Sequence, residues 1–364
     1  MGSIATGGQL GAIVLAAGEG TRMRSSTPKP LHELCGRAMV LHILDALAMI
    51  DVDRVVVVVG HQAERVRAAI IDGAPQGLDV QFVTQEQQRG TGDAVSIALS
   101  AFDHFREGDD LLVMPADTPL LTSTTLANLV RRHRAVDTAV TLLSTTLEDP
   151  TGYGRILRAR DGRVCGIVEQ ADATEQEQLI REINTSIYCF RAALVGPALR
   201  RISASNAQGE LYLTDIVGVL FEAGYQSDAL VGDQDEVAGV NDRLQLAAAE
   251  AVMRRRINES WMRRGINLED PDGTMIDWSV VLHADTQILA GTSLRGHCEV
   301  GGGCRIGPHA VIEDARIGEN VIIRSAEIRG ATVGNAATIE SFCQLGPDAQ
   351  VADAEVLEAF TKRP

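Results

Sequence analysis

Aliphatic residues recur every six positions in the C-terminal third of the chain. They are Ile288, Leu294, Val300 and Ile306, then Val311, Ile317 and Ile323, then Val333, Ile339, Leu345, Val351 and Leu357, and glycine directly follows several of them. Hexapeptides of this kind build a left-handed parallel β-helix, in which the aliphatic residue points inward and small residues form the corners. An ordinary β-sandwich is the alternative, but alternating strands do not keep a six-residue spacing for this long. We therefore expect a short left-handed parallel β-helix of about four coils over residues 266–364.

The chain before the repeats alternates between apolar runs and helical patterns, from residue 11 to about residue 235. The expected strands include residues 13–16, 55–59, 111–114 and 139–143, and the expected helices residues 41–50, 63–71, 92–99 and 122–134. The apolar runs are continuous, which indicates strands buried on both faces in a mostly parallel sheet covered by helices. This pattern predicts a Rossmann-like α/β domain whose ligands bind at the carboxyl ends of the strands.

A segment rich in helix formers separates the two patterns. Residues 244–264, LQLAAAEAVMRRRINESWMRR, contain neither glycine nor proline and end in basic residues, which suit the C-terminal end of a helix dipole. We expect one long helix here, stopped by Gly265. The expected organisation is an N-terminal domain at residues 1–240, a linker helix at residues 241–265 and the β-helix at residues 266–364.

The overall charge restricts the partners. The chain has 364 residues and a formal net charge of -16, which argues against general binding of nucleic acid. No apolar run approaches 18 residues and no charged segment precedes the first strand, so we expect neither a transmembrane helix nor a signal peptide. These features predict a cytoplasmic protein without a nucleic-acid or membrane partner.

The loop after the first strand, LAAGEGTRMRSSTPK at residues 15–29, points to an anionic ligand. It contains neither a G-x-G-x-x-G nor a G-x-x-x-x-G-K-[ST] pattern. Its small residues would let backbone N–H groups approach phosphate oxygens, while Arg22 and Lys29 would add positive charge. Taken alone, the loop is equally compatible with a tight turn that carries solvated basic side chains.

Eight segments, taken in order, make the case more specific. They are LAAGEGTRM with a later PK, QEQQRGTGDA, PADTPLL, TGYGRI, VEQADAT, EINTSIY, ELYLTD and VAGVNDR. Together they resemble the N-acetylglucosamine-1-phosphate uridyltransferase half of the bifunctional bacterial enzyme of the GlmU type. The resemblance covers residues 11 to about 300 closely, and the β-helix resembles the start of that enzyme's second domain.

The resemblance implies a role for each matching position. The nucleotide-binding residues would be Leu15, Ala16, Ala17, Gly18, Gln85, Gly90 and Thr91. The sugar-phosphate-binding residues would be Gly154, Glu169 and Asn184. The catalytic cations would be Arg22 and Lys29, and the residues that hold Mg²⁺ would be Asp117 and Asn241. These residue types suit the roles, because an amide can both donate to and accept from a base, and Mg²⁺ prefers oxygen ligands completed by phosphates.

Three of these residues also have simpler interpretations. Asp117 follows a strand and precedes a helix, so it could be only a helix cap or a turn residue. Asn241 could likewise cap the linker helix, and Glu169 could be an exposed charge at the end of a strand.

The implied reaction is attack of a sugar-1-phosphate oxygen on the α-phosphorus of a nucleoside triphosphate, with release of pyrophosphate. The best-matching substrates are UTP and N-acetylglucosamine 1-phosphate. Another nucleotide, or another sugar or cyclitol 1-phosphate, remains an alternative, because the family commonly has His at Asp93 and Tyr-Gly or Ser-Gly at Pro115 and Ala116. An alanine near the sugar pocket should narrow it. A non-catalytic nucleotide-binding regulatory protein is the alternative from a different class.

The second domain departs further from the family. Acetyl transfer depends there on an arginine, a lysine and a histidine in later coils, whereas this sequence has no histidine after His309. We therefore expect no acetyltransferase activity, and we expect the β-helix to form a homotrimer.

Overall fold

The computed structural model describes residues 8–103 and 105–364. Contacts divide the chain into two units, one with the residues up to His32 and Ala38–Leu246, the other with Glu33–Arg37 and Ala247–Pro364. Helix α8 (Arg243–Arg263) begins in the first unit and continues in the second, and Gly265 follows it with a φ of 93°. This helix matches the one expected at residues 244–264.

Within the described residues, nine strands of the first unit form one sheet. Seven run in the order β11-β7-β10-β6-β1-β4-β5, while β8 pairs with β10 and with β9. Their bounds are β1 (Leu10–Ala16), β4 (Arg54–Val59), β5 (Val80–Thr84), β6 (Asp110–Pro115), β7 (Val140–Thr146), β8 (Arg155–Arg158), β9 (Val164–Val168), β10 (Glu182–Arg191) and β11 (Ser227–Val231). Strands β5, β4, β1 and β6 are parallel, β11 is parallel to β7, and β10 is antiparallel to β6 and β7. The mostly parallel sheet predicted from the apolar runs is confirmed.

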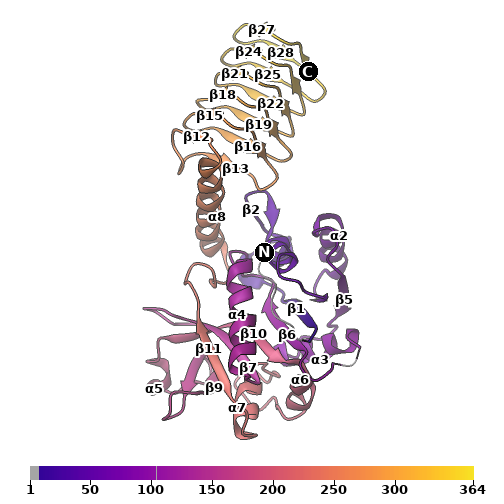
Figure 1. The fold of residues 1–364 in the computed structure, drawn as a ribbon, viewed down its shortest axis with the longest axis vertical. Helices are drawn as coiled ribbons and strands as arrows, with labels where there is room; N and C mark the ends of the chain where they lie inside the picture. Colours follow the sequence, from indigo (N-terminus) through magenta and orange to yellow (C-terminus); the bar gives the residue numbers. More distant parts are fainter. Residues whose placement is uncertain (1–7, 104) are drawn as a thin grey trace. The chain divides into compact units, whose positions relative to one another are not determined.

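Helices cover both faces of this sheet (Figure 1). They are α1 (Met39–Ala48), α2 (Ala63–Gly73), α3 (Thr91–Ala98), α4 (Ser123–Val136), α6 (Ala192–Leu199) and α7 (Asp215–Glu222). The shorter elements before α8 are α5 (Glu175–Gln178), which has no buried residue, 3-10 turns at Thr21–Met23, Lys29–Leu31 and Leu99–Ala101, and the paired strands β2 (Glu33–Leu34) and β3 (Arg37–Ala38). Side chains of α1, α2 and α4 pack in one core, and those of α3, α6 and α7 in the other. The strands feed both cores, because successive side chains point to opposite faces.

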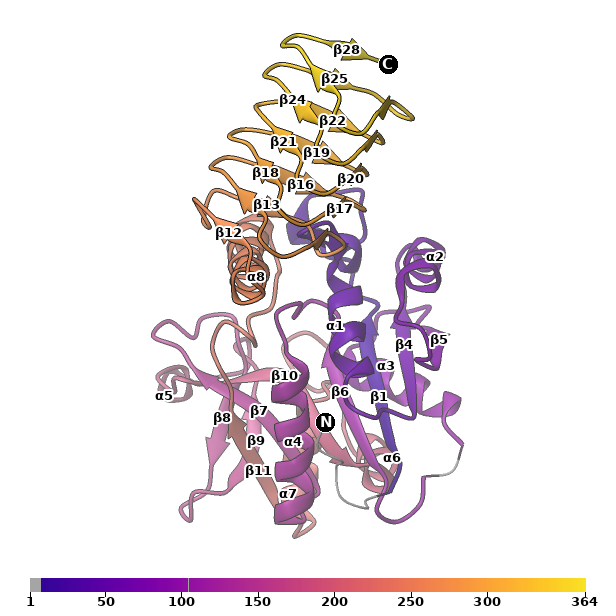
Figure 2. The same cartoon turned by 45° about the horizontal axis from the view of Figure 1, so that its top comes forward.

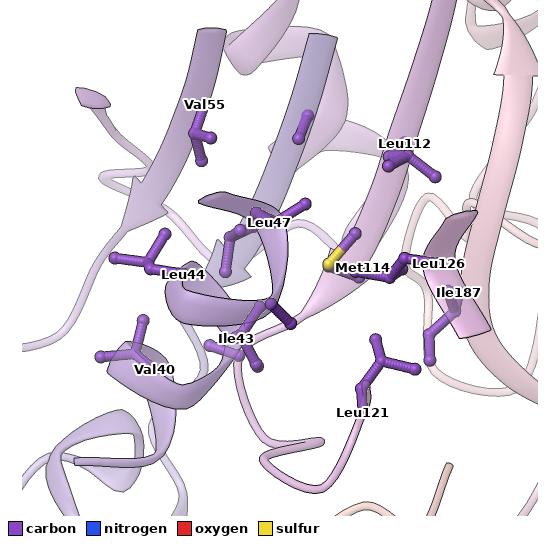
Figure 3. Close-up of a cluster of buried hydrophobic side chains, with 14 of the residues drawn as sticks. Val40, Ile43, Leu44, Leu47, Val55, Leu112, Met114, Leu121, Leu126 and Ile187 are labelled. Carbon is purple, nitrogen blue, oxygen red and sulfur yellow. The ribbon is translucent and has the colours of Figure 1, made fainter. Parts of the chain in front are cut away.

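The side of α1 that faces the sheet shows how the sequence builds this layer. Ile43, Leu44 and Leu47 are fully buried and lie against Val55 of β4 and Met114 of β6 (Figure 3). Leu47 follows Leu44 by three positions and Ile43 by four, so the three side chains share one face of the helix. Burial of each such side chain contributes about 1.5–3 kcal/mol.

Strand order places the ligand-binding edge of the sheet. The chain goes from β1 to β4 and β5 on one side, and then to β6 on the other side of β1. The connections after β1 and after β5 therefore lead to opposite sides of β1, which makes a topological switch point between β1 and its neighbours. Ligands of parallel sheets bind in the crevice that such a point leaves at the carboxyl ends of the strands.

The residues of the second unit after α8 form the predicted left-handed parallel β-helix, built from three parallel sheets (Figure 2). One sheet contains β12 (Asn267–Leu268), β15 (Gln287–Ile288), β18 (Arg305–Ile306), β21 (Ile322–Ile323), β24 (Thr338–Ile339) and β27 (Val356–Leu357). Another contains β13 (Met275–Ile276), β16 (Ser293–Arg295), β19 (Val311–Glu313), β22 (Glu327–Arg329), β25 (Gln344–Leu345) and β28 (Lys362–Arg363). The third contains β14 (Val281–Leu282), β17 (Glu299–Val300), β20 (Arg316–Ile317), β23 (Thr332–Val333) and β26 (Gln350–Val351).

The expected number of coils was too low. The sheets contain six, six and five strands, one from each coil, so the described β-helix is longer than the four coils expected. It begins at Leu268, and the buried Ile276 and Leu282 already follow the six-residue spacing that leads to Ile288.

The inward residue of β19 was also misassigned. Ile312 is fully buried, whereas the predicted Val311 is partly exposed. Several later inward steps cover five residues rather than six, as from Ile312 to Ile317, and one added or missing residue reverses which neighbour points inward. A search for a strict spacing of six cannot find such shortened turns.

None of the helices in residues 8–103 and 105–364 combines the length and the apolar composition needed to cross a bilayer.

Candidate active site

The loop after β1 is shaped around Lys29. Gly20 has a φ of 63°, and a Cβ added there would lie 2.6 Å from the Cβ of Lys29. Glycine is therefore needed at this position both for its backbone conformation and for the close approach of the lysine stem. A Cβ added at Gly18, by contrast, would meet no atom within 4 Å. The protein does not itself exclude a side chain there, so the small residue leaves open space beside the loop.

Lys29 contacts both residues to which the family resemblance gives a metal-binding role. Its Nζ donates to Oδ2 of Asp117 and, at 2.7 Å, to Oδ1 of Asn241. Arg22 Nη2 donates to the same Asn241 oxygen at 2.9 Å. The backbone N–H of Val240 donates to the carbonyl oxygen of Asp117 at 2.8 Å, which fixes the segment before α8 beside the end of β6. Four predicted site residues from three separate segments of the sequence therefore meet at one point.

The capping interpretations of Asp117 and Asn241 were wrong. The cap of α4 is Thr122, whose side chain accepts from the backbone N–H of Thr125. At the start of α8, Asp242 Oδ1 accepts from the N–H of Gln245 at 2.9 Å. Both predicted metal residues thus keep their side-chain oxygens directed at Lys29 rather than at a helix end.

The predicted base-binding residues lie beyond the neighbouring strands. The backbone N–H of Gln85, which directly follows β5, donates to the carbonyl of Val59 at 2.8 Å, and Gln88 Nε2 donates to the carbonyl of Ala17 at 2.9 Å. Gly90 has a φ of 106°, and a Cβ there would lie 2.5 Å from a backbone oxygen of Leu211. This segment is therefore connected, through Gln88, to the end of β1, which contains Leu15 and Ala16, and to Ala17 and Gly18 in the loop that follows.

A cavity of about 550 Å³ opens beside these loops. Its lining residues are Leu15, Arg22, Thr91, Gly152, Glu169, Gln170, Ala171, Ser186, Tyr188, Gln208, Glu210, Tyr212, Leu213 and Thr214. Arg22 belongs both to this lining and to the cluster around Lys29, so the two features form one site.

Two lining residues have side chains in unusual environments. Burial raises the pKa of the Glu169 carboxyl, although one of its oxygens accepts from the Thr214 hydroxyl at 3.0 Å. Glu169 is thus not the exposed strand-end charge that the sequence left open. Tyr212 has a buried hydroxyl without a hydrogen-bond partner in the described structure. The pKa of this hydroxyl is raised to about 12, mainly by burial and also by the negative charge of nearby carboxylates. A buried polar group without a partner in a cavity wall is suited to a ligand that supplies one.

Gly154 and Asn184, the other two predicted sugar-phosphate residues, adjoin the cavity wall without being among its lining residues. Asn184 Nδ2 donates to Tyr188 Oη at 2.8 Å, and its backbone N–H donates to the carbonyl of Gly154 at 2.9 Å. A Cβ added at Gly154 would lie 3.3 Å from Glu169 Oε2. The structure therefore brings all three together, with only Glu169 lining the cavity.

Sequence reasoning missed several lining residues. Ser186 lies at a register shift of β10 and has a φ of 61°. Because serine has no particular preference for this left-handed conformation, the sequence did not indicate it. Gln170 could have been predicted as a lining residue, since it directly follows Glu169 in the VEQADAT segment. Its Oε1 accepts from the fully buried Arg155 at 2.7 Å and from the N–H of Gly152 at 3.2 Å, which leaves its N–H groups for other partners.

Ala116 does not narrow this cavity as the sequence suggested. It is 2% exposed and belongs to the hydrophobic core beneath β6, and its N–H donates to the carbonyl of Leu15 at 2.9 Å. The methyl group of Ala116 therefore packs in the core and does not line the cavity, so it does not reduce the space for a sugar.

Comparison with known proteins gives matches for both units. Residues 12–186 match the MobA-like NTP transferase domain, and residues 279–314 match the bacterial transferase hexapeptide (six repeats). The protein named bifunctional protein GlmU from Mycolicibacterium vanbaalenii is 44% identical over 352 residues, which cover 96% of this chain and 71% of the relative. Proteins of the same name are 42% identical in Streptomyces coelicolor, over 96% of this chain and 72% of the relative, and 41% identical in Mycobacterium tuberculosis, over 98% and 72%.

The relatives' name also bears on the second activity. Because they are called bifunctional, the comparison gives no support to the expected absence of acetyltransferase activity. Since the identity extends over both units and most of each relative, the chain belongs to the GlmU family and is a nucleotidyltransferase.

Proposed function

We propose that the enzyme catalyses the Mg²⁺-dependent reaction of UTP with N-acetylglucosamine 1-phosphate to UDP-N-acetylglucosamine and pyrophosphate. The observation that carries this proposal is the convergence of Lys29, Arg22, Asp117 and Asn241 beside the polar cavity. The family resemblance supplies the identity of the base and the sugar. The hexapeptide repeats are compatible with the homotrimer expected from the sequence, which stays a prediction.

The residues present fit a magnesium ion. Asp117 and Asn241 offer one carboxylate and one amide oxygen, the hard donors that Mg²⁺ prefers, and the Lys29 ammonium already shows that both oxygens can contact one cation. No cluster of three or more His, Cys, Asp or Glu side chains in the described part of the chain forms a closed metal site. This is the pattern expected when substrate phosphates complete the coordination. When bound, Mg²⁺ would neutralise phosphate charge and polarise the α-phosphoryl group.

The basic side chains would handle the charge that the reaction moves. The nucleophile is a phosphate oxygen that is already an anion, so no general base is needed, and the barrier comes from bringing two anions together. Backbone N–H groups around Gly18 would hold the nucleotide phosphates. Arg22 and Lys29 would stabilise the negative charge that develops on the departing pyrophosphate.

The cavity would hold the sugar. Glu169 and Asn184 suit hydroxyl and acetamido groups, with Glu169 accepting from a sugar hydroxyl and Asn184 keeping Tyr188 and Gly154 in place. Tyr212 would hydrogen-bond a polar substituent of the sugar through its otherwise unpaired hydroxyl.

Tyr212→Phe tests this assignment of the cavity. The variant keeps the ring and removes only the hydroxyl, so we expect the KM for N-acetylglucosamine 1-phosphate to rise about fivefold to tenfold, with little change in the KM for UTP. Initial rates at varied concentrations of each substrate measure this. Tyr225→Phe is the matched control, because Tyr225 is 40% exposed and lies outside the cavity. An unchanged KM for the sugar phosphate would contradict the assignment.

The proposed reaction itself is tested by pyrophosphate release. The four nucleoside triphosphates are each combined with a panel of sugar and cyclitol 1-phosphates, with and without Mg²⁺. We expect the highest kcat/KM for UTP with N-acetylglucosamine 1-phosphate and no turnover without a divalent cation. A different preferred pair would replace the substrate assignment, and binding of UTP without turnover of any pair would favour the non-catalytic alternative.

A further inference from the structure

The side-chain amide of Gln85 has a fixed orientation in the candidate base site. Its Nε2 donates to Asp93 Oδ2 at 2.8 Å and to the carbonyl oxygen of Gly90 at 3.1 Å. Both N–H groups of the amide are therefore used inside the protein. Gln85 is only 5% exposed, and its Oε1 accepts no hydrogen bond from any residue that the structure describes.

The two partners of Nε2 permit only this orientation. Rotating the amide by 180° would place Oε1 against a carboxylate and a backbone carbonyl, three acceptors without a proton between them. Asp93 excludes that arrangement more firmly than a neutral side chain would, because an ionised carboxylate can only accept. Gln85 therefore offers the ligand an acceptor and no donor.

That acceptor lies at the edge of the sheet where the nucleotide loop lies. Gln85 directly follows β5, its N–H is bound to the last residue of β4, and Asp93 is in the first turn of α3. Gln88, in the same loop as Gln85, is bound to the carbonyl of Ala17. A nucleotide with its phosphates at the Gly18 loop would thus present its base toward this segment.

We propose that Asp93 is a positioning residue that fixes Gln85 as a hydrogen-bond acceptor and thereby selects a pyrimidine nucleotide whose ring N3 carries a proton. Uracil and thymine have N3–H, whereas the N3 of cytosine is itself an acceptor and would face Gln85 Oε1 without a proton between them. The inference rests on the proposed nucleotidyltransferase function and deepens it, because it makes one side chain responsible for the choice of base.

Asp93→Asn tests the inference with almost no change in shape. An asparagine amide can donate to Gln85 Oε1, so only the carbonyl of Gly90 still opposes the turned Gln85 amide, and the orientation that presents N–H groups to the ligand becomes more populated. We expect the preference for UTP over CTP in kcat/KM to fall about tenfold to a hundredfold, mainly through the KM values, with kcat for UTP nearly unchanged. Titration calorimetry of UTP and CTP should give the same change in the ratio of Kd values without turnover.

Two further variants complete the experiment. Asp72→Asn makes the same chemical change at an exposed position of α2 and should leave the ratio unchanged. Gln85→Leu removes the acceptor while leaving Asp93 in place, and should abolish the preference even if Asp93→Asn folds poorly. Thermal unfolding of each variant shows whether it is folded.

The outcomes separate this inference from the proposed function. Equal Kd values for UTP and CTP in the unaltered enzyme would overturn the inference, whether or not the enzyme turns either of them over. A clear preference for UTP that survives Asp93→Asn in a folded variant would overturn it as well, even if Gln85→Leu loses the preference, while the pyrophosphate assay would still support the proposed function. A preference in Kd that both variants reduce supports the inference even if no sugar phosphate in the panel is a substrate.

Discussion

Asp117→Ala is expected to reduce kcat/KM by about a thousandfold and to leave a residual rate that Mg²⁺ does not increase. The reason is the position of the carboxylate, two residues beyond the end of β6, where it shares one cation with Asn241. Without it, a single amide oxygen remains as a protein ligand, which is too little to hold a strongly hydrated ion beside the phosphates. Initial rates over a range of Mg²⁺ concentrations measure both effects.

Two controls separate loss of the metal ligand from loss of the fold. Asp117→Asn keeps the side-chain volume and one oxygen ligand, so it should be less impaired than Asp117→Ala and should respond to higher Mg²⁺. Asp72→Ala removes an exposed carboxylate on α2 and should behave like the unaltered enzyme. If the Mg²⁺ titration of Asp117→Ala matches that of the unaltered enzyme, then Asp117 does not hold the metal.

Periodicity alone predicted most of the fold, because burial leaves direct traces in the sequence. The run RVVVVV of β4 is buried on both faces, and the six-residue spacing from Ile288 to Ile306 follows from the three flat sides of a coil. What periodicity could not predict was a local change of step. Ile312 lies six residues after Ile306 and points inward, and the next step, to Ile317, covers only five residues without losing the hydrogen-bonded register between coils. Counting back six residues from Ile317 therefore gave the wrong residue, Val311.

The candidate site was predictable in its members but not in its contacts. The motifs supplied Lys29, Asp117 and Asn241, and the position of Asp117 at the carboxyl end of a parallel strand followed from general rules. That one ammonium would bridge the two predicted metal residues did not follow, because it depends on how the loop folds back at Gly20. The conformation of Ser186 and the pairing of Gln85 with Asp93 are likewise set by tertiary contacts rather than by local sequence.

Lys29→Ala is expected to lower kcat about a hundredfold to a thousandfold while the KM for UTP changes little. A lysine that interacts with charge developing on the leaving group contributes in the transition state more than in the ground state, so its loss appears in turnover. A high KM for UTP with normal turnover at saturation would assign Lys29 to binding instead. Lys362→Ala is a close control, since Lys29 and Lys362 are the two lysines of the sequence and Lys362 is exposed in β28.

The Mg²⁺ dependence of Lys29→Ala distinguishes a catalytic role from a purely structural one. In the structure the ammonium contacts the same two oxygens that would bind the metal, so lysine and metal compete for them. If Lys29 acts on the phosphates once the metal has entered, its removal eliminates this competition, and the half-saturating Mg²⁺ concentration should fall or stay constant although kcat is low. If Lys29 instead serves to hold Asp117 and Asn241 in place for the metal, its removal should raise that concentration. Combining Lys29→Ala with Asp117→Ala should cost far less than the product of the two single effects, because residues that act on one phosphoryl group as a unit are not additive.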